Sequence, residues 1–228
     1  NVHMYEVTSL FDGLISSNLK ILLHLYDRFK GDDSLRLFFQ FGSSEEYGSE
    51  GSPFVETQRE RPNSPYALVK QLTTNTAIML YDNYGFPTMV VRPGNLFGPG
   101  QNKSKFLPSV IEQLRKGEPL NVSPCEQRRD SIHVDVFSLD IHGLLKHADR
   151  VVGQIVNVSS GQSISLRQII DFYKEALHST SEINYGALSY RENEAMDLRC
   201  NIGKLLMIAT KKIIINIFIK YTNLIIRR

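Results

Sequence analysis

Residues 35–48 read LRLFFQFGSSEEYG, a short apolar run that ends in glycine, hydroxyls and carboxylates. An apolar run of this length, residues 35–41, is typical of a buried strand. Polar side chains that directly follow a strand stand at its carboxyl end, where open α/β sheets hold their ligands. The stretch therefore predicts an α/β fold and a site that begins at Ser43.

A helix is predicted over residues 65–84, where Gly85-Phe86-Pro87 ends it. Tyr66 and Lys70 are four positions apart, so they share one face of that helix. A neighbouring cation stabilises a phenolate and lowers the pKa of a tyrosine. Tyr66 would then exchange a proton with a substrate hydroxyl near neutral pH.

The same spacing also joins Tyr26 to Lys30, so spacing alone does not choose between the two pairs. The polar segment that follows residues 35–41 favours the Tyr66 pair. Tyr26 and Lys30 have no such neighbour in the sequence and are expected on a surface helix.

Strands and helices alternate along the chain. Further helices are expected over residues 11–30, 107–115 and 135–148 and after the N-cap Ser165, and further strands over residues 88–92, 132–134 and 153–158. This alternation predicts βαβ units and a parallel sheet flanked by helices.

Composition narrows the class of protein. The 228 residues are enough for one domain or one and a half. Residues 205–228 hold five basic residues and no acid, which leaves the rest of the chain with a net charge of −3 and argues against a nucleic-acid-binding body. The two cysteines form no CxxC pair, which favours a reducing, cytoplasmic compartment. The six histidines show no HxxxH or HExxH spacing, so no metal site is expected.

Residues 205–228 differ from the rest, with eight isoleucines and no glycine or proline. Their longest uncharged stretch after Lys212 is residues 213–219, too short for a span of ~20 residues. Two interpretations stay open: a basic helix on a membrane surface, and AT-rich DNA translated out of frame.

Ordered motifs connect the chain to a known family. They are SSEEYG (43–48), SPYALVK (64–70), RPGNLFGPGQ (92–101), QRRDSIHVD (127–135), and YRE (190–192) with residues 197–205. Together they resemble the extended short-chain dehydrogenase/reductase family, specifically its NAD(P)-dependent nucleotide-sugar epimerases, dehydratases and reductases. The resemblance covers about residues 18–205.

The resemblance implies a domain organisation. Residues 1–100 would be the C-terminal part of a Rossmann-like NAD(P)-binding domain, an incomplete parallel sheet flanked by helices. Residues 101–204 would form a small α/β substrate-binding portion together with a returning strand at 153–158. No GxxGxxG pattern precedes Gly42, so we expect an N-terminally truncated chain without the first βα units. Residues 205–228 form the atypical tail.

The resemblance also implies catalytic roles. Ser43 would hydrogen-bond the reacting sugar oxygen, and Glu45 would help to remove water, as in the family's dehydratases. Tyr66 would be the acid/base, Lys70 would hold the nicotinamide ribose, and Pro93 would lie beside the nicotinamide. Ser43 as a simple turn residue and Glu45 as a solvated acid remain open alternatives.

Four further positions match residues that contact the nucleotide diphosphate: Asn95, Lys105, Arg129 and Arg191. Guanidinium forks pair bidentately with phosphate oxygens, which suits a diphosphate. The alternative is a turn residue at Asn95 and solvated charges at the other three.

Two functions follow. The first is an enzyme that moves a hydride between the C4 of a nucleotide sugar and NAD or NADP, in the biosynthesis of deoxysugars or surface polysaccharides. The alternative is a catalytically inactive remnant that at most binds nucleotide sugars. A homodimer through residues 65–84 is implied by the family. The sequence names neither the sugar nor the nucleotide.

Overall fold

The computed structural model describes residues 2–49, 51–192 and 194–209, with side chains from residue 7 onward. The helices are α1 (Val2–Ile15), α2 (Ile21–Phe29), α3 (Pro65–Tyr84), α4 (Phe106–Lys116), α5 (Val134–Leu145), α6 (Ala148–Val151), α7 (Leu166–Ala176) and α8 (Gly203–Ala209), with a π turn η1 (Ser16–Lys20) and a 3-10 turn η2 (Ser44–Tyr47). The strands are β1 (Phe38–Phe41), β2 (Thr88–Pro93), β3 (Asn95–Phe97), β4 (Leu120–Val122), β5 (Arg128–His133), β6 (Ile155–Val158), β7 (Ser163–Ser165), β8 (Ile183–Tyr185) and β9 (Asp197–Leu198).

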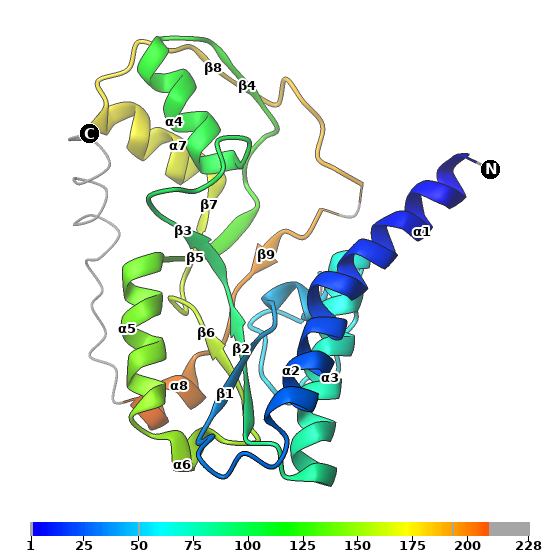
Figure 1. The fold of residues 1–228 in the computed structure, drawn as a ribbon. Coiled ribbons are helices and arrows are strands. Elements are labelled where there is room, and N and C mark those ends of the chain that lie inside the picture. Colours follow the sequence, from blue (N-terminus) through cyan, green and yellow to red (C-terminus); the bar gives the residue numbers. More distant parts are fainter. Residues whose placement is uncertain (1, 50, 193, 210–228) are drawn as a thin grey trace.

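Three parallel strands in the order β1-β2-β6 form the sheet that carries the site. Successive residues of β2 point to opposite faces, as a pleated strand requires. Met89 and Val91 pack with α5 and α8, whereas Val90 packs with α2 and α3. The sheet is therefore covered by helices on both faces (Figure 1), and the predicted α/β class is confirmed.

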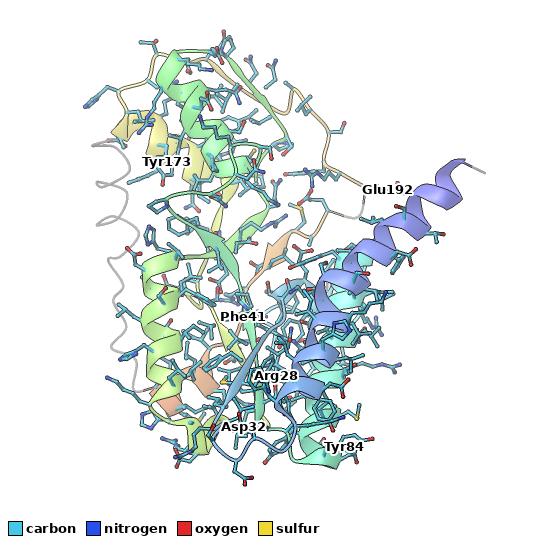
Figure 2. All side chains as sticks on the ribbon, in the orientation of Figure 1. Arg28, Asp32, Phe41, Tyr84, Tyr173 and Glu192 are labelled. Atoms are coloured by element: carbon cyan, nitrogen blue, oxygen red, sulfur yellow. The ribbon has the colours of Figure 1, made fainter. Side chains whose placement is uncertain are left out.

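The remaining strands form the other part of the structure. β5 pairs with β3 and β9 in parallel and with β7 antiparallel, and β4 pairs with β8. α4 and α7 pack around Leu114, Ile170 and Tyr173. Figure 2 shows Tyr173 in this part, far along the molecule from Asp32 at the base of the first sheet.

The longest predicted helix is confirmed. Pro65 begins α3 after the N-cap Ser64, and Gly85 ends it with φ 66°, a left-handed conformation that glycine adopts without strain. The helix predicted from residue 11 instead starts at Val2. Val7 and Leu10 are 49% and 51% exposed. Because residues 7–10 do not bury an apolar face, their sequence lacks the helical spacing of apolar residues from which the helix would be predicted.

The first strand is shorter than predicted. Its pairing with β2 begins at Phe38, opposite Thr88, directly after Pro87. Residues 35–37 therefore lie outside the ladder.

The end of the described chain packs into the core. Residues 205–209 belong to α8, where Leu205 and Ile208 are buried against β6 and α5. The rest of the isoleucine-rich tail, residues 210–228, lies outside the described residues. Among the residues that are described, no helix has the length and apolar character needed to cross a membrane.

Candidate functional site

The loop after β1 fixes Ser43 with a capping box. Ser43 is the N-cap of η2, and its Oγ accepts a hydrogen bond from the Glu45 amide at 3.2 Å. In return, the Glu46 carboxylate accepts one from the Ser43 amide at 2.8 Å. Such reciprocal bonds satisfy the free donors of a first helical turn. They hold the Ser43 side chain at the carboxyl end of the sheet.

The first turn of α3 brings Tyr66 to Ser43. The N-cap Ser64 accepts a hydrogen bond from the Ala67 amide at 3.1 Å, which fixes where the helix begins. The Ser43 side chain lies near enough to the Tyr66 hydroxyl to act to lower the pKa of that group. The Lys70 Nζ donates to the Phe41 carbonyl at 2.9 Å and lies 5.7 Å from the centroid of the Tyr66 ring. The three residues form one cluster.

The pKa of Tyr66 corrects one expectation. We expected Lys70 to lower it, but the pKa of Tyr66 is raised. Burial is the largest cause; the Ser43 hydrogen bond opposes it, and the charges of Glu45 and Glu46 raise the pKa further. Burial also lowers the pKa of Lys70, against the charge of Glu46. The Tyr66 phenol is therefore protonated at neutral pH.

A buried ion pair that the sequence analysis missed supports this cluster. Arg92 and Glu46 are fully buried, and the Arg92 Nε and Nη2 lie 2.8 and 2.7 Å from the Glu46 Oε2. The Arg92 Nη2 also lies 2.6 Å from Glu60. Burial raises the pKa of Glu46, and the Arg92 charge opposes this. One feature of the sequence could have predicted this ion pair: Arg92 lies near the end of an otherwise apolar strand. A cation buried there needs an anion as its partner.

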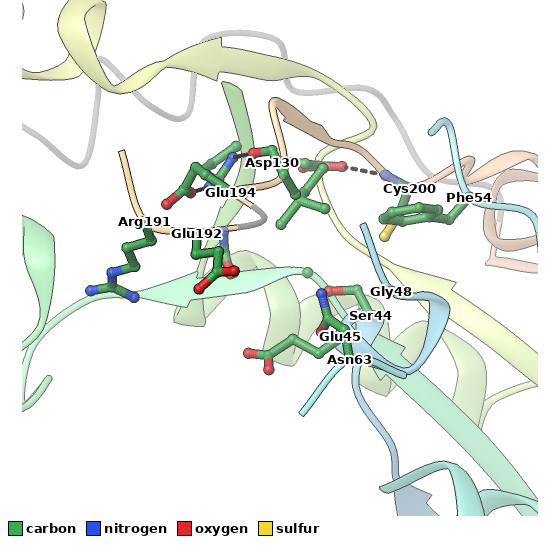
Figure 3. A pocket seen from close by; sticks show the side chains of 15 residues that line it. Ser44, Glu45, Gly48, Phe54, Asn63, Asp130, Arg191, Glu192, Glu194 and Cys200 are labelled. Atoms are coloured by element: carbon green, nitrogen blue, oxygen red, sulfur yellow. Dashed lines mark hydrogen bonds and ion pairs between the residues drawn. The ribbon is translucent and has the colours of Figure 1, made fainter. Parts of the chain in front are cut away.

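A cavity of about 300 Å³ opens beside the cluster. Its lining comprises Ser44, Glu45, Gly48, Phe54, Asn63, Gly94, Asn95, Arg129, Asp130, Arg191, Glu192, Glu194, Ala195, Leu198 and Cys200. Four of the predicted site residues, Glu45, Asn95, Arg129 and Arg191, are therefore brought together although they are far apart in sequence. Figure 3 shows Arg191 and Glu192 on one side of the cavity and Ser44 and Glu45 on another.

Arg129 is held by the cavity wall. Its Nη1 donates to the Ala195 carbonyl at 2.8 Å, and its Nη2 forms an ion pair with Glu194. Burial lowers the pKa of Arg129, and Glu194 opposes that effect. Arg191 is exposed at the same cavity. The cavity thus carries two guanidinium groups, one of them already paired with a carboxylate.

Asp130, which was not predicted from the sequence, connects separate segments that surround the cavity. Its buried carboxylate accepts hydrogen bonds from the amides of Ser160, Gly161 and Cys200 at 3.0, 3.1 and 3.1 Å. The bond to Cys200 is drawn in Figure 3. Because these donors lie on separate segments, Asp130 fixes the strand that carries Arg129.

Five of the predicted residues lie outside this lining: the neighbouring cluster of Ser43, Tyr66 and Lys70, together with Pro93 and Lys105. Pro93 ends β2 next to Gly94, which does line the cavity. A Cβ at Gly94 would lie 2.0 Å from the Ser159 Oγ, so this turn requires glycine. Lys105 is exposed at the start of α4 and is not brought to the cavity. No group of three potential metal ligands occurs in the described part of the chain.

The parallel sheet flanked by helices, with the Ser43, Tyr66 and Lys70 cluster at its carboxyl edge, defines a Rossmann-like α/β protein. The family model of the NAD dependent epimerase/dehydratase family matches residues 11–159. The chain belongs to this family, which confirms the resemblance drawn from its motifs.

Curated relatives agree with this family. The chain is 30% identical to CDP-abequose synthase of Salmonella muenchen over 111 residues, which cover 49% of this chain and 38% of that protein. It is 27% identical to GDP-6-deoxy-D-mannose reductase of Pseudomonas aeruginosa, over 82% of this chain and 64% of that protein. The chain thus spans less than two thirds of the length of these relatives.

Solved structures share the fold. UDP-glucuronic acid 4-epimerase from Bacillus cereus, in complex with UDP-glucuronic acid and NAD, superposes with a TM-score of 0.78 at 20% identity. The match covers 86% of this chain and 62% of that one. This likeness supports a Rossmann-like sheet.

Proposed function

We propose that this chain is the catalytic and substrate-binding part of an NAD(P)-dependent nucleotide-sugar epimerase, dehydratase or reductase that acts at the sugar C4. The carrying observation is the cluster of Ser43, Tyr66 and Lys70 beside a cavity with two arginines. NAD or NADP, when bound, accepts or returns the hydride. Tyr66 moves the proton of the C4 oxygen, and Ser43 orients that oxygen.

The remaining roles follow from the positions of the side chains. Lys70 lies at the Tyr66 ring, where its ammonium would meet the nicotinamide ribose, and Pro93 would border the nicotinamide. Glu45 is exposed at the cavity, where a carboxylate would assist loss of water from the sugar. In this proposal, residues 1–100 would bind the dinucleotide and residues 101–204 would bind the substrate.

A nucleotide diphosphate is the proposed ligand of the cavity. Arg129 and Arg191 are two cations that would face its phosphates, with Asn95 beside them. Lys105 does not line the cavity, so it would contact the diphosphate only if its side chain extended toward the cavity. The name of one relative specifies a 6-deoxy sugar, which supports a role in deoxysugar or surface-polysaccharide biosynthesis.

The test measures the turnover of nucleotide sugars by the whole protein that the gene encodes. Tyr66→Phe should lower turnover about 10²–10⁴-fold, the usual contribution of a general acid or base. Tyr26→Phe is the matched control, because Tyr26 has the same spacing to a lysine, and it should leave turnover unchanged. Equal turnover for both variants would contradict the assignment.

The alternative is a remnant that binds nucleotide sugars without catalysis. The chain has the arginine-lined cavity, but no GxxGxxG pattern occurs in its sequence before Gly42. Calorimetry of this chain with CDP-, GDP-, dTDP- and UDP-sugars and with NAD separates the cases. Binding of sugars alone supports the remnant, binding of NAD supports a complete site, and binding of neither indicates a non-functional fragment.

We also propose a homodimer through α3. Leu68, Leu72 and Met79 are 45%, 45% and 39% exposed, and their spacing places them along one side of the helix. Such an apolar stripe suits a second copy of the chain. Sedimentation should show a dimer that Leu72→Glu converts to a monomer; a monomeric unmodified chain would contradict the proposal.

A further inference from the structure

Glu46 is a buried carboxylate next to the candidate site to which the proposed function gives no role. Its side chain is fully buried, and it accepts three hydrogen bonds and forms an ion pair with Arg92. The Ser43 amide and the Thr74 hydroxyl bind its Oε1 at 2.8 and 3.0 Å, and two nitrogens of Arg92 bind its Oε2. With donors at both oxygens and a guanidinium at one of them, this carboxyl group only accepts, as an ionised carboxylate does.

These donors come from three separate elements. Ser43 lies in the loop after β1, Thr74 on α3 and Arg92 on β2. Because α3 also carries Tyr66, Glu46 ties the backbone of Ser43 to the helix that presents the phenol. The carboxylate thus holds together the two residues that must meet at a substrate oxygen.

The packing around Glu46 is specific to this carboxylate. A Cβ at Gly42 would lie 2.4 Å from the Glu46 Oε1, so only glycine leaves room for the oxygen there. On the other side, Arg92 lies over the Tyr47 ring at 4.5 Å and also pairs with Glu60.

We propose that Glu46 is a positioning residue, which holds Ser43 within reach of Tyr66 and supplies a buried negative charge to Tyr66 and Lys70. The proposal rests on the proposed function only in naming Ser43, Tyr66 and Lys70 as the reacting cluster. A negative charge disfavours a phenolate and favours an ammonium. Accordingly, the charge of Glu46 acts to raise the pKa of both Tyr66 and Lys70.

The other charges that face this cluster define the control. The side chains whose charges act on Tyr66 are Glu45 and Glu46, and Lys70 lies at its ring. Glu60 pairs with the same arginine as Glu46 but acts on neither Tyr66 nor Lys70 in this way. Glu46→Gln and Glu60→Gln therefore each remove one carboxylate partner of Arg92, and they differ in their effect on the cluster.

The experiment measures two titrations in the isolated chain. Tyr66 is followed by NMR of [13Cζ]tyrosine, assigned with Tyr66→Phe, and Lys70 by the pH dependence of its acylation in a mass-resolved peptide. In Glu46→Gln, both should titrate at lower pH than in the unmodified chain. In Glu60→Gln, neither should move. A purely structural role of Glu46 would reduce the stability of Glu46→Gln and shift neither titration.

A second variant guards against loss of folding in Glu46→Gln. The triple change Glu46→Leu, Glu60→Gln and Arg92→Met removes every charge of this ion-pair group, which is tolerated better than leaving one buried charge unpaired, and it still removes one net negative charge. The same downward shifts are expected. Unmoved titrations in either folded variant would overturn the proposal. Because no substrate is used, this result is independent of the turnover test at Tyr66.

Discussion

Two tyrosine–lysine pairs with the same spacing have different surroundings. The lysine Nζ lies 5.7 Å from the ring centroid in the Tyr66–Lys70 pair and 5.6 Å in the Tyr26–Lys30 pair. The helix therefore gives both pairs nearly the same internal geometry. Any chemical difference between them must come from what each pair contacts.

Those contacts differ in kind. Tyr26 packs edge-on against Phe86 at 5.3 Å, and Lys30 pairs with Asp27 on the surface. Figure 2 shows this end of the molecule at Arg28 and Tyr84, away from Glu192 at the cavity. Tyr66 instead meets a hydroxyl at the end of a strand, above a buried ion pair. Helical spacing fixes a geometry, whereas tertiary neighbours decide whether it supports chemistry.

The largest difference between the two regions should be in stability. Arg92→Met leaves Glu46 buried without its cation, which should cost about 3–5 kcal/mol. The comparable change near the other pair, Arg28→Met, removes an exposed arginine and should cause no measurable loss. Urea unfolding of both variants measures the effect. Equal stability of the two variants would mean that the buried pair does not support the site.

The next effect is expected at Ser43. Ser43→Ala removes an N-cap, which should cost about 1 kcal/mol. It also removes a hydrogen bond that lowers the pKa of Tyr66, so Tyr66 should titrate at higher pH. Ser165→Ala removes a cap with the same capping box on α7 and should cost a similar free energy without changing the Tyr66 titration. Equal titrations in both variants would remove Ser43 from the cluster.

Much of the fold could be predicted because its long elements carry strong local signals. Helix α3 has proline at its start and glycine at its end, and Ser165 begins α7 as predicted. The strands β3, β4, β7, β8 and β9 were missed. Each has two or three residues, too few for an alternating pattern to be recognised, and their pairing depends on partners distant in the chain.

The residues of the candidate site were predictable where they belong to ordered motifs. They were less predictable where their interaction partners are distant in sequence. Glu45, Asn95, Arg129 and Arg191 meet at one cavity as expected for a shared site. The pairing of Glu46 with Arg92 spans 46 positions and left only a weak local signal. The expected effect of Lys70 on the pKa of Tyr66 was wrong because burial, the dominant cause, is a property of the folded chain.

A smaller effect concerns the pH dependence of stability. The pKa of Tyr66 in the folded chain lies above its ordinary value of 10.0. The contribution of Tyr66 to stability is therefore complete below about pH 10 and is lost as the pH rises through the folded-state pKa. The free energy of unfolding should fall more steeply above pH 10 in the unmodified chain than in Tyr66→Phe. If the free energy of unfolding fell equally with pH in both proteins, the pKa of Tyr66 would not be raised by folding.

The smallest effect is expected at the lysine of the other pair. Lys30 pairs with Asp27 at 2.7 Å, but the two side chains are 56% and 63% exposed. Water and salt screen such a pair, so Lys30→Met should leave the melting temperature unchanged. Lys70→Met removes a hydrogen bond to the Phe41 carbonyl and should cost about 1 kcal/mol. Thermal melts of the two variants, which make the same substitution at the same helical spacing, test the comparison directly. Equal losses would mean that spacing within the helix outweighs the neighbours that distinguish the two pairs.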